Sequence, residues 1–193
     1  TGVLIILTDK DTKKQEDIMA MEKEYVFEMV LGVVSETYDM EGPLHLTSSG
    51  WNVPSKEAVV KAFSSYVGEI DQKVPVYSAV KYKGKALYKY ARAGKEASVE
   101  VPTKKVNIYS LELSEYLHQN EFPFMGKVLK LPFIKGVVRC GKGTYIRSLV
   151  YDLGQDFGGG GVLTSLVRTK VGNYKVEDAI DVDLLSQLRS DLT

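Results

Sequence analysis

Residues 128–161 hold a predicted strand, a tight turn and a predicted helix in direct succession. Residues 128–140 are rich in Val, Leu, Ile and Phe, which favour a strand, and the turn Gly141-Lys142-Gly143 follows them. The next segment, residues 144–157, carries apolar side chains at helical spacing, at Ile146, Leu149, Val150, Leu153 and Phe157. Glycines at positions 158–161 end this helix. This stretch alone requires a fold that combines a helix with a strand.

The N-terminal part of the chain is predicted to contain two strands with a helix between them. Residues 3–7 (VLIIL) are predicted to form a buried strand, and residues 25–34, rich in Val, Phe and Tyr, a second strand. Thr12 followed by Gln15 has the spacing of a capping box, which starts a short helix that runs to about Met21.

The remaining predicted elements follow no regular alternation. An amphipathic helix is predicted from Ser55, a favoured N-cap residue, to Gly68. Residues 106–113 are predicted to form a strand, and residues 118–126 a loop rich in polar and aromatic residues. The sequence contains no internal repeat and no linker long enough to divide it. We therefore expect one α+β domain over residues 1–193.

The composition supports one hydrophobic core and excludes several classes of protein. The chain has 193 residues, 44% of them apolar, which suits a single sizeable core. Its one cysteine, Cys140, excludes an internal disulfide framework, and its two histidines, His45 and His118, offer few ligands for zinc. The longest apolar runs are far shorter than the roughly 20 residues of a membrane-spanning helix. We expect a cytoplasmic protein with no metal and no membrane association.

The charged residues are distributed unevenly along the chain. Taken whole, 25 basic and 25 acidic residues cancel, which argues against a nucleic-acid partner. However, residues 71–147 hold 15 basic and 6 acidic residues, whereas residues 1–70 hold 6 basic and 12 acidic residues. The basic residues between Lys73 and Lys105 are interleaved with four tyrosines, Tyr77, Tyr82, Tyr88 and Tyr90.

This basic, tyrosine-rich segment has two interpretations. Cations neutralise phosphates and aromatic faces stack on exposed bases, so the mixture suits RNA better than a small anion. Alternatively, the segment is a solvated helix or hairpin whose tyrosines reach into the core. Composition alone leaves both interpretations open.

The segment from Gly136 to Thr144 resembles a phosphate-binding P-loop in spacing but not in chemistry. The position that would offer a hydroxyl to magnesium is Gly143, and the preceding residues look like a strand rather than a glycine-rich cradle. What remains is a helix N-terminus with Lys142 and, one turn further, Arg147, which suits an anion. The alternative is a well-capped helix with a surface lysine.

Four residues at three further places in the chain are candidate site residues, and each place also has a structural interpretation. Arg147 lies at the boundary of the apolar stripe, so it faces solvent or points into a cleft, where a guanidinium requires a carboxylate or phosphate partner. Tyr25 begins a strand, where a tyrosine is usually a packing residue. Asp39 and Glu41 hint at a metal loop, but two carboxylates do not complete an octahedral set of oxygen ligands, and we reject a metal here.

Several motifs resemble those of the TruB-type tRNA pseudouridine synthases, and they occur in the family's order along the chain. The two longest are specific enough to identify the family, and the resemblance covers nearly the whole chain. The matching stretches are K-E-Y at residues 23–25, T-Y-D-M-E-G at 37–42, Q-K-V-P-V-Y-S-A-V-K-Y-K-G at 72–84 with Tyr88 and A-R-A-G at 91–94, C-G-K-G-T-Y-I-R at 140–147 with D-L-G at 152–154, and L-V-R-T at 166–169 with V-G at 171–172.

The chain departs from the family's pattern at a few positions. Val74 replaces a proline, Gly141 a serine, Gly161 an alanine and Val167 an arginine, and these local changes leave the family assignment intact. A larger departure concerns the family's nucleophilic aspartate, which belongs to a G-T-L-D-P-x-A-T-G motif whose last two letters resemble Thr1-Gly2.

The resemblance therefore implies that the aspartate would precede residue 1. We expect an N-terminally incomplete catalytic domain over residues 1–193, without the C-terminal RNA-binding domain of many relatives. The implied fold is the pseudouridine synthase core, in which helices flank a mixed, mainly antiparallel sheet.

The family's reaction detaches a uracil from its ribose, rotates it and rejoins it through C5, without a cofactor. By resemblance, Tyr25 would stack on the uracil and act as a general base, while Tyr145 and Leu166 would line the pocket. Arg147 would pair with the nucleophilic aspartate, since a nearby cation keeps a carboxylate ionised. This implication favours the cleft interpretation of Arg147.

The implied partner is the T-arm stem-loop of tRNA, and the implied reaction converts its uridine 55 to pseudouridine. Lys81 and Lys142 would bind phosphates or polar groups of the pocket. The residues that would follow the RNA backbone are Lys83, Lys85, Lys89 and Arg92. We expect a monomer that is inactive without the aspartate. The alternative is a non-catalytic RNA-binding or tRNA-folding module, which would have no need of the aspartate.

Overall fold

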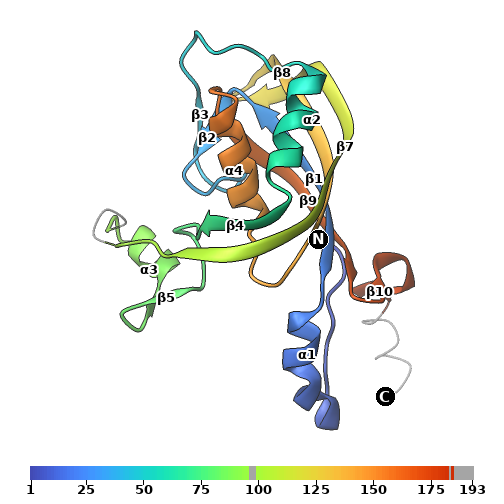
Figure 1. Cartoon of the computed structure of the whole chain (residues 1–193). Coiled ribbons are helices and arrows are strands. Elements are labelled where there is room, and N and C mark those ends of the chain that lie inside the picture. The colour runs from blue at the N-terminus through green and yellow to red at the C-terminus, as the bar shows by residue number, and fades with distance from the viewer. Residues whose placement is uncertain (96–98, 183, 185–193) are drawn as a thin grey trace.

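The fold is built on a curved antiparallel sheet that runs through the body of the molecule (Figure 1). The computed structural model describes residues 1–95, 99–182 and 184. Within these residues the sheet has six strands in the order β10-β9-β1-β8-β7-β4, and neighbouring strands pair antiparallel. The strands are β1 (Lys23–Leu31), β4 (Gly68–Lys73), β7 (Thr103–Phe124), β8 (Lys127–Cys140), β9 (Gly161–Val171) and β10 (Tyr174–Lys175). In this part of the chain, parallel pairing occurs at isolated bridges, those of Gly2 with Arg168 and of Asp39 with Leu163.

Two helices, α2 (Lys56–Ser65) and α4 (Ile146–Asp156), lie side by side on one face of the sheet (Figure 1). The Ser55 hydroxyl caps α2 by accepting a hydrogen bond from the Ala58 N–H at 3.2 Å, as its sequence predicts. The core lies between these helices and the sheet, and its fully buried side chains include Phe27, Met29, Phe63 and Leu149. The predicted α+β class is confirmed.

The other face of the sheet is polar along most of β1 but apolar at the end of that strand, where Val30 packs with Phe122 and Val162 in a second hydrophobic cluster. Along β1, residues that alternate with the core positions point to this face, and two of them form ion pairs with lysines on the flanking strands. Glu28 pairs with Lys135 at 2.9 Å, and Glu24 pairs with Lys170 at 3.3 Å. These ion pairs let the second face remain in contact with water, so the sheet carries its main helical layer on one side.

Two smaller units complete the described chain. Strands β2 (Val33–Ser35) and β3 (Leu44–Leu46) form a hairpin at the end of β1, and residues 36–43 connect them. Strands β5 (Lys81–Tyr82) and β6 (Lys85–Ala86) and the short helix α3 (Leu87–Ala91) form a unit that projects from one side of the molecule (Figure 1). Together with the flanking residues, this unit is the basic arm, residues 76–95.

The predictions for the N-terminal segment are partly wrong. Residues 3–7 form no strand: Val3 is buried, but Leu4 and Ile6 are 73% and 71% exposed. The predicted helix exists, but it begins as a 3₁₀ helix, η1 (Asp9–Lys14), followed by α1 (Gln15–Ala20). Thr12 does not form the predicted capping box, because its hydroxyl donates to the Asp9 carbonyl at 2.7 Å.

The predicted loop at residues 118–126 is also wrong. β7 continues through Phe124, and a two-residue turn at Met125 and Gly126 joins it to β8. Both turn residues have positive φ, at 48° and 76°, which is the geometry of a tight hairpin turn. Among residues 118–124 only Phe122 is buried, so the segment shows little of the apolar–polar alternation that marks a half-buried strand.

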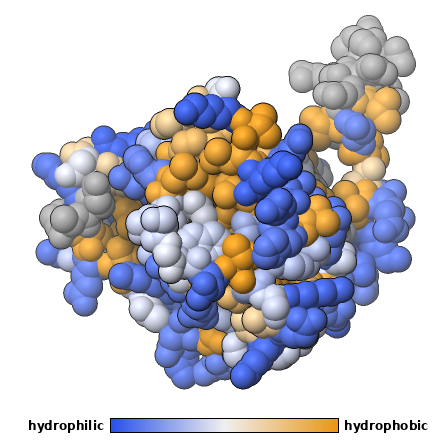
Figure 2. All heavy atoms as spheres, turned by 90° about the horizontal axis from the view of Figure 1, so that it is seen from above, coloured by the Kyte–Doolittle hydropathy of each residue, from blue (hydrophilic) through white to orange (hydrophobic). Residues whose placement is uncertain are grey.

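Some apolar side chains reach the surface. Seen from above, hydrophobic residues gather in one area that hydrophilic residues surround (Figure 2). No helix in the described part of the chain is long and apolar enough to cross a membrane.

Candidate functional site

The N-terminus of α4 is fixed to the edge strand β4 by one buried side chain. Gln72 is 1% exposed, and its amide nitrogen donates to the Tyr145 carbonyl at 3.1 Å. Its amide oxygen accepts from the Tyr145 N–H at 2.8 Å. Tyr145 is the N-cap residue of α4, so Gln72 satisfies a backbone group that the helix start leaves without an intrahelical partner. The position of α4 relative to the sheet is thereby set.

Arg147, in the first turn of α4, joins two other parts of the chain. Its Nη1 lies 3.3 Å from Oδ2 of Asp39, and its Nη2 donates to the Tyr77 carbonyl. The two charged side chains are only 22% and 19% exposed. Arg147 therefore points into a cleft rather than to solvent, as the resemblance implied, and within the described residues its carboxylate partner is Asp39.

Asp39 is itself held in place by its own loop. Its Oδ1 accepts from the Thr37 hydroxyl at 2.6 Å and from the Glu41 N–H at 3.1 Å. Its Oδ2 is then left for Arg147. The sequence indicated Asp39 as a possible metal ligand and as part of a family motif, and it predicted no partnership with Arg147. Its T-Y-D-M-E-G motif was the one available signal.

A cavity of about 550 Å³ opens beside this ion pair. Arg147 and Arg92 bring positive charge to its wall, which suits a phosphate or carboxylate. The hydroxyl of Ser78 is buried at the same wall and has no hydrogen-bond partner among the described residues. The lining residues are Thr37, Glu41, Tyr77, Ser78, Ala79, Tyr88, Arg92, Tyr145 and Arg147.

Tyr25 and Leu166 lie on the neighbouring strands β1 and β9. Both pack against the core beneath the first turns of α4, where Ile146 and Leu149 are buried. Leu166 also lines a cavity of about 200 Å³ together with Asp39. Burial raises the pKa of the Tyr25 hydroxyl, and a hydrogen bond from Arg168 opposes this effect only in part. Proton abstraction by a Tyr25 phenolate is therefore made harder, whereas stacking by its ring is unaffected.

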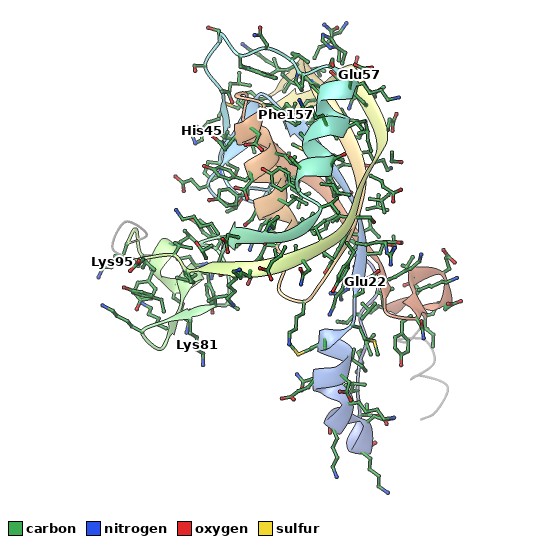
Figure 3. All side chains as sticks on the ribbon, in the orientation of Figure 1. Glu22, His45, Glu57, Lys81, Lys95 and Phe157 are labelled. Carbon is green, nitrogen blue, oxygen red and sulfur yellow. The ribbon has the colours of Figure 1, made fainter. Side chains whose placement is uncertain are left out.

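The basic arm holds all four predicted backbone-binding residues, and Lys81 projects from it (Figure 3). Its cations lie over tyrosine rings of the same arm. Lys83 lies 5.3 Å from the Tyr82 ring centroid, and Lys85 lies 4.9 Å from that of Tyr90. Tyr82 and Tyr90 also pack against a small hydrophobic cluster of Val74, Leu87 and Val99, so these tyrosines both contact cations and help to form the core of the arm.

The arm's other predicted residues are Lys89, in α3, and Arg92, which lies 5.4 Å from the Tyr88 ring centroid. Lys142 lies apart from the arm and from the 550 Å³ cavity. It borders a separate cavity with Gln15, Glu16 and Met19.

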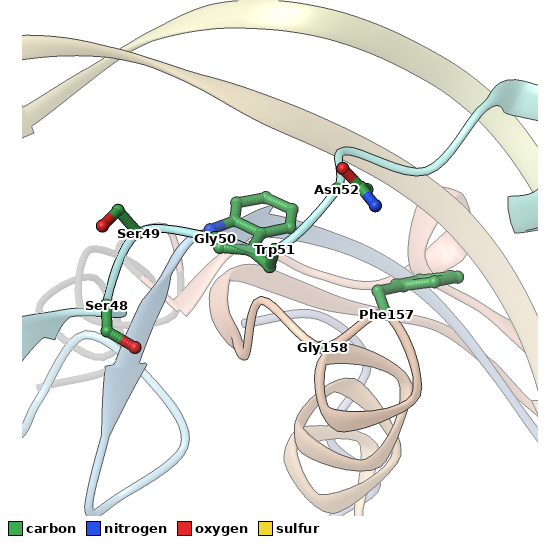
Figure 4. A pocket seen from close by; sticks show the side chains of 7 residues that line it. All are labelled: Ser48, Ser49, Gly50, Trp51, Asn52, Phe157 and Gly158. Atoms are coloured by element: carbon green, nitrogen blue, oxygen red, sulfur yellow. The ribbon is translucent and has the colours of Figure 1, made fainter.

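Another cavity, of about 490 Å³, lies at the far end of α4 (Figure 4). Trp51 and Phe157 supply its aromatic surface, and Ser48, Ser49 and Asn52 supply its polar groups. No charged residue lines it. Because the 550 Å³ cavity has both arginines and the N-terminus of α4, it is the stronger candidate site. The described residues contain no group of three or more His, Cys, Asp or Glu side chains suited to a metal ion.

Comparison with known proteins gives a consistent result. Residues 1–146 match the model of the TruB family pseudouridylate synthase (N terminal domain). The chain is 39% identical over 187 residues to tRNA pseudouridine synthase B of Clostridium tetani, covering 97% of this chain and 59% of that protein. It is 37% identical over 187 residues to the protein of the same name from Flavobacterium johnsoniae, covering 97% and 75%.

Solved structures show the same fold. The chain aligns with a Cbf5-Nop10-Gar1 complex with a TM-score of 0.61 and 24% identity, covering 100% of this chain and 44% of that chain. It aligns with an H/ACA RNP bound to a substrate RNA containing 2′-deoxyuridine with a TM-score of 0.54 and 18% identity, covering 96% and 41%. The chain thus spans only part of the proteins that it matches. On the match over residues 1–146 and these identities, it belongs to the TruB family of pseudouridylate synthases.

Proposed function

We propose that this chain is the catalytic core of a tRNA pseudouridine synthase that converts uridine 55 of the T arm to pseudouridine. The observation that carries the proposal is the ion-paired Arg147 at the wall of the 550 Å³ cavity, between Tyr145 and the basic arm. The curated relatives, which are named tRNA pseudouridine synthase B, support tRNA as the substrate. We further propose that the protein acts as a cytoplasmic monomer.

The proposed reaction is an isomerisation with no net gain or loss of atoms. The bond between C1′ and N1 of the uridine breaks, a bond between C1′ and C5 forms, and the proton lost from C5 is balanced by one gained at N1. A carboxylate nucleophile assists this exchange, and it must be ionised to react. Arg147 is suited to hold it ionised, since a cation close to a carboxylate favours the charged form.

The target base has to leave its stack before it can react. The cavity is large enough for one nucleotide, and Tyr145 contributes an aromatic wall. Tyr25 and Leu166, on β1 and β9, do not line this cavity, but Leu166 lines the 200 Å³ cavity that Asp39 also borders. We assign these two residues to the apolar contact with the extruded uracil.

The basic arm would bind the RNA backbone. Lys83, Lys85 and Arg92 each lie over a tyrosine ring, so their charged groups are oriented in the free protein. We assign Lys81 and Lys89 to the same surface, and Lys142 to a phosphate contact beyond it. Because cations already cover these tyrosine faces, we expect phosphate contacts from the arm rather than base stacking.

The nucleophilic aspartate is proposed to belong to a segment that precedes Thr1. On this proposal, the 193-residue chain binds the T arm but does not turn over. A second candidate is a non-catalytic RNA-binding or tRNA-folding module. It is favoured by the pairing of Arg147 with Asp39, which already gives the arginine a carboxylate partner among the described residues.

The test uses a T-arm stem-loop RNA with uridine at position 55, and a matched RNA with cytidine there. The proteins compared are the 193-residue chain and the same chain extended by the residues that its gene encodes before Thr1. Binding is measured by fluorescence anisotropy, and pseudouridine by reverse-transcription stops after carbodiimide treatment.

We expect both proteins to bind, and only the extended protein to form pseudouridine at position 55. Binding by both without product from either would favour the non-catalytic module. Absence of binding by both would overturn the RNA assignment altogether.

A further inference from the structure

Next to the Asp39–Arg147 ion pair, Tyr38 and Tyr151 form a stacked pair of rings. Their centroids are 4.1 Å apart and their planes differ by 24°. Tyr38 directly precedes Asp39, and Tyr151 lies four residues after Arg147 on α4. Residues four apart on a helix lie on the same face. Two consecutive loop residues therefore contact two consecutive turns of one helix.

The backbone of Tyr38 is held in a conformation that tyrosine rarely adopts. Its φ is +65°, in the left-handed region, which costs a residue with a side chain free energy relative to glycine. Its N–H donates to the Ser35 carbonyl at 3.1 Å, and its carbonyl accepts from the Leu163 N–H at 3.0 Å. Tyrosine persists in this conformation because contacts around it compensate, and the stack on Tyr151 is one such contact of its side chain.

The rest of the loop leaves little freedom to Asp39. The hydroxyls of Ser35 and Thr37 are 3.0 Å apart, and Thr37 also accepts from the Gly42 N–H at 3.0 Å. The Thr37 hydroxyl and the Glu41 N–H both donate to Oδ1 of Asp39, which fixes the carboxylate within the loop. The direction of its Oδ2 is then set by where the loop lies on α4. The aromatic stack is the contact that joins this loop to α4 beside the ion pair.

We infer that the Tyr38–Tyr151 stack is a positioning element that docks the 35–42 loop on α4 and so fixes Asp39 against Arg147. Both tyrosines are positioning residues, since neither lines the 550 Å³ cavity. The stack keeps the guanidinium pointed at that cavity before any ligand arrives. The functional meaning of the Tyr38–Tyr151 stack rests on the proposed function, whereas its effect on the position of the Arg147 side chain does not.

The test is ¹⁵N NMR of the arginine side chains in the 193-residue chain, with Arg147 assigned by the loss of its signals in Arg147→Lys. A guanidinium held by an ion pair rotates slowly about its Nε–Cζ bond and shows separate Hη signals. We expect Tyr151→Leu to lose the separate signals of Arg147, and Tyr151→Phe, which keeps the stack, to retain them. Tyr174→Leu, an exposed tyrosine on β10, is the matched control and should change nothing at Arg147.

Tyr38→Gly tests the same contact from the other side, and it is expected to fold because glycine relieves the positive φ. It should lose the separate Arg147 signals as Tyr151→Leu does. Unchanged Arg147 signals in either folded variant, or their loss in Tyr151→Phe, would overturn the inference.

Binding of the T-arm RNA is measured in parallel on the same proteins. If Arg147 responds as expected but no variant binds RNA, the proposed function fails and the positioning role stands. If RNA binds and Arg147 is unaffected, the positioning role fails and the RNA-binding part of the proposed function stands.

Discussion

Gln72 and Tyr145 exchange two hydrogen bonds, at 2.8 and 3.1 Å, between a buried side-chain amide and a helix N-cap backbone. The side chain takes the place of a neighbouring strand, because it offers the backbone one acceptor and one donor. The contact joins β4, which leads into the basic arm, to the helix that carries Arg147.

Replacing Gln72 with Met should destabilise the protein. Methionine is similar in length, but it leaves the Tyr145 N–H without a partner, while the Tyr145 carbonyl keeps only its bond from the Leu149 N–H at 3.1 Å, so we expect a cost of about 2 kcal/mol. Urea unfolding measures the loss. Gln119→Met, at an exposed position in β7, is the control and should change stability by less than about 0.5 kcal/mol. A loss of stability below about 1 kcal/mol for Gln72→Met would contradict the role of Gln72 in fixing α4 to β4.

The side chains of Asp39 and Arg147 should show a larger coupling energy than those of an exposed ion pair. In a double-mutant cycle with Asp39→Asn and Arg147→Met, we expect a coupling energy of about 2 kcal/mol, because both side chains are largely buried. The exposed pair of Lys14 and Asp11, whose side chains are 66% and 60% exposed, is the matched comparison, at less than about 0.5 kcal/mol. Equal coupling in the two cycles would refute the buried ion pair.

Two buried serines should respond differently to alanine. Ser78 has no hydrogen-bond partner among the described residues, so Ser78→Ala should be neutral or stabilising, within about 0.5 kcal/mol. Ser148, which is 2% exposed, donates to the Lys73 carbonyl at 3.1 Å, so Ser148→Ala should cost about 1 to 2 kcal/mol. Thermal and urea unfolding distinguish them. A clear loss for Ser78→Ala would mean that its hydroxyl is bonded in solution.

Stability should depend on pH through Asp152. Burial and, secondarily, the nearby Asp156 raise the pKa of the Asp152 carboxyl from 3.8 to about 6, against the opposing effect of Lys73. The folded state thus binds this proton more tightly than the unfolded state, and protonation of Asp152 stabilises the fold. This stabilisation is complete below pH 3.8 and is lost as pH rises through about 6.

Asp152→Asn should therefore stabilise the protein at pH 7, by about 1 kcal/mol after allowance for solvent screening, and by much less near pH 4. Urea unfolding of both proteins across this range gives the difference. Asp156→Asn should weaken the pH dependence without removing it, since burial is the larger cause. If the free energies of unfolding of Asp152→Asn and the parent differed by the same amount at all pH values, Asp152 would be excluded as the source of the pH dependence.

The basic arm should bind RNA mainly through its charges. Replacing Lys83, Lys85 and Lys89 with Gln should weaken binding of all stem-loop sequences alike and reduce the slope of log K against log salt by up to about 2. A triple change of Lys13, Lys127 and Lys130, which lie outside the arm, is the control for net charge. Equal effects of the two triple variants would exclude the arm as a specific backbone-binding surface.

The helices of the core were predictable because their signals are local. Ser55 caps α2 as expected, and α4 ends where the glycines begin. The strand at residues 3–7 and the loop at 118–126 were predicted wrongly, because apolar runs and polar stretches become strands only when a partner pairs with them. Asn120, for example, is in a strand because it pairs with Leu131 across the hairpin.

The site divides in the same way. Tyr145 and Arg147 lie in one short motif, so the sequence alone determined that an aromatic ring and a cation begin the same helix, and its motifs identified the family. Only the tertiary structure decided that Arg147 faces a cleft and that its partner is Asp39, which is 108 residues away along the chain. The reason is physical: the direction of a side chain at the edge of an apolar stripe depends on which loop packs against that helix. Here the 35–42 loop does so, with the rings of Tyr38 and Tyr151 in contact.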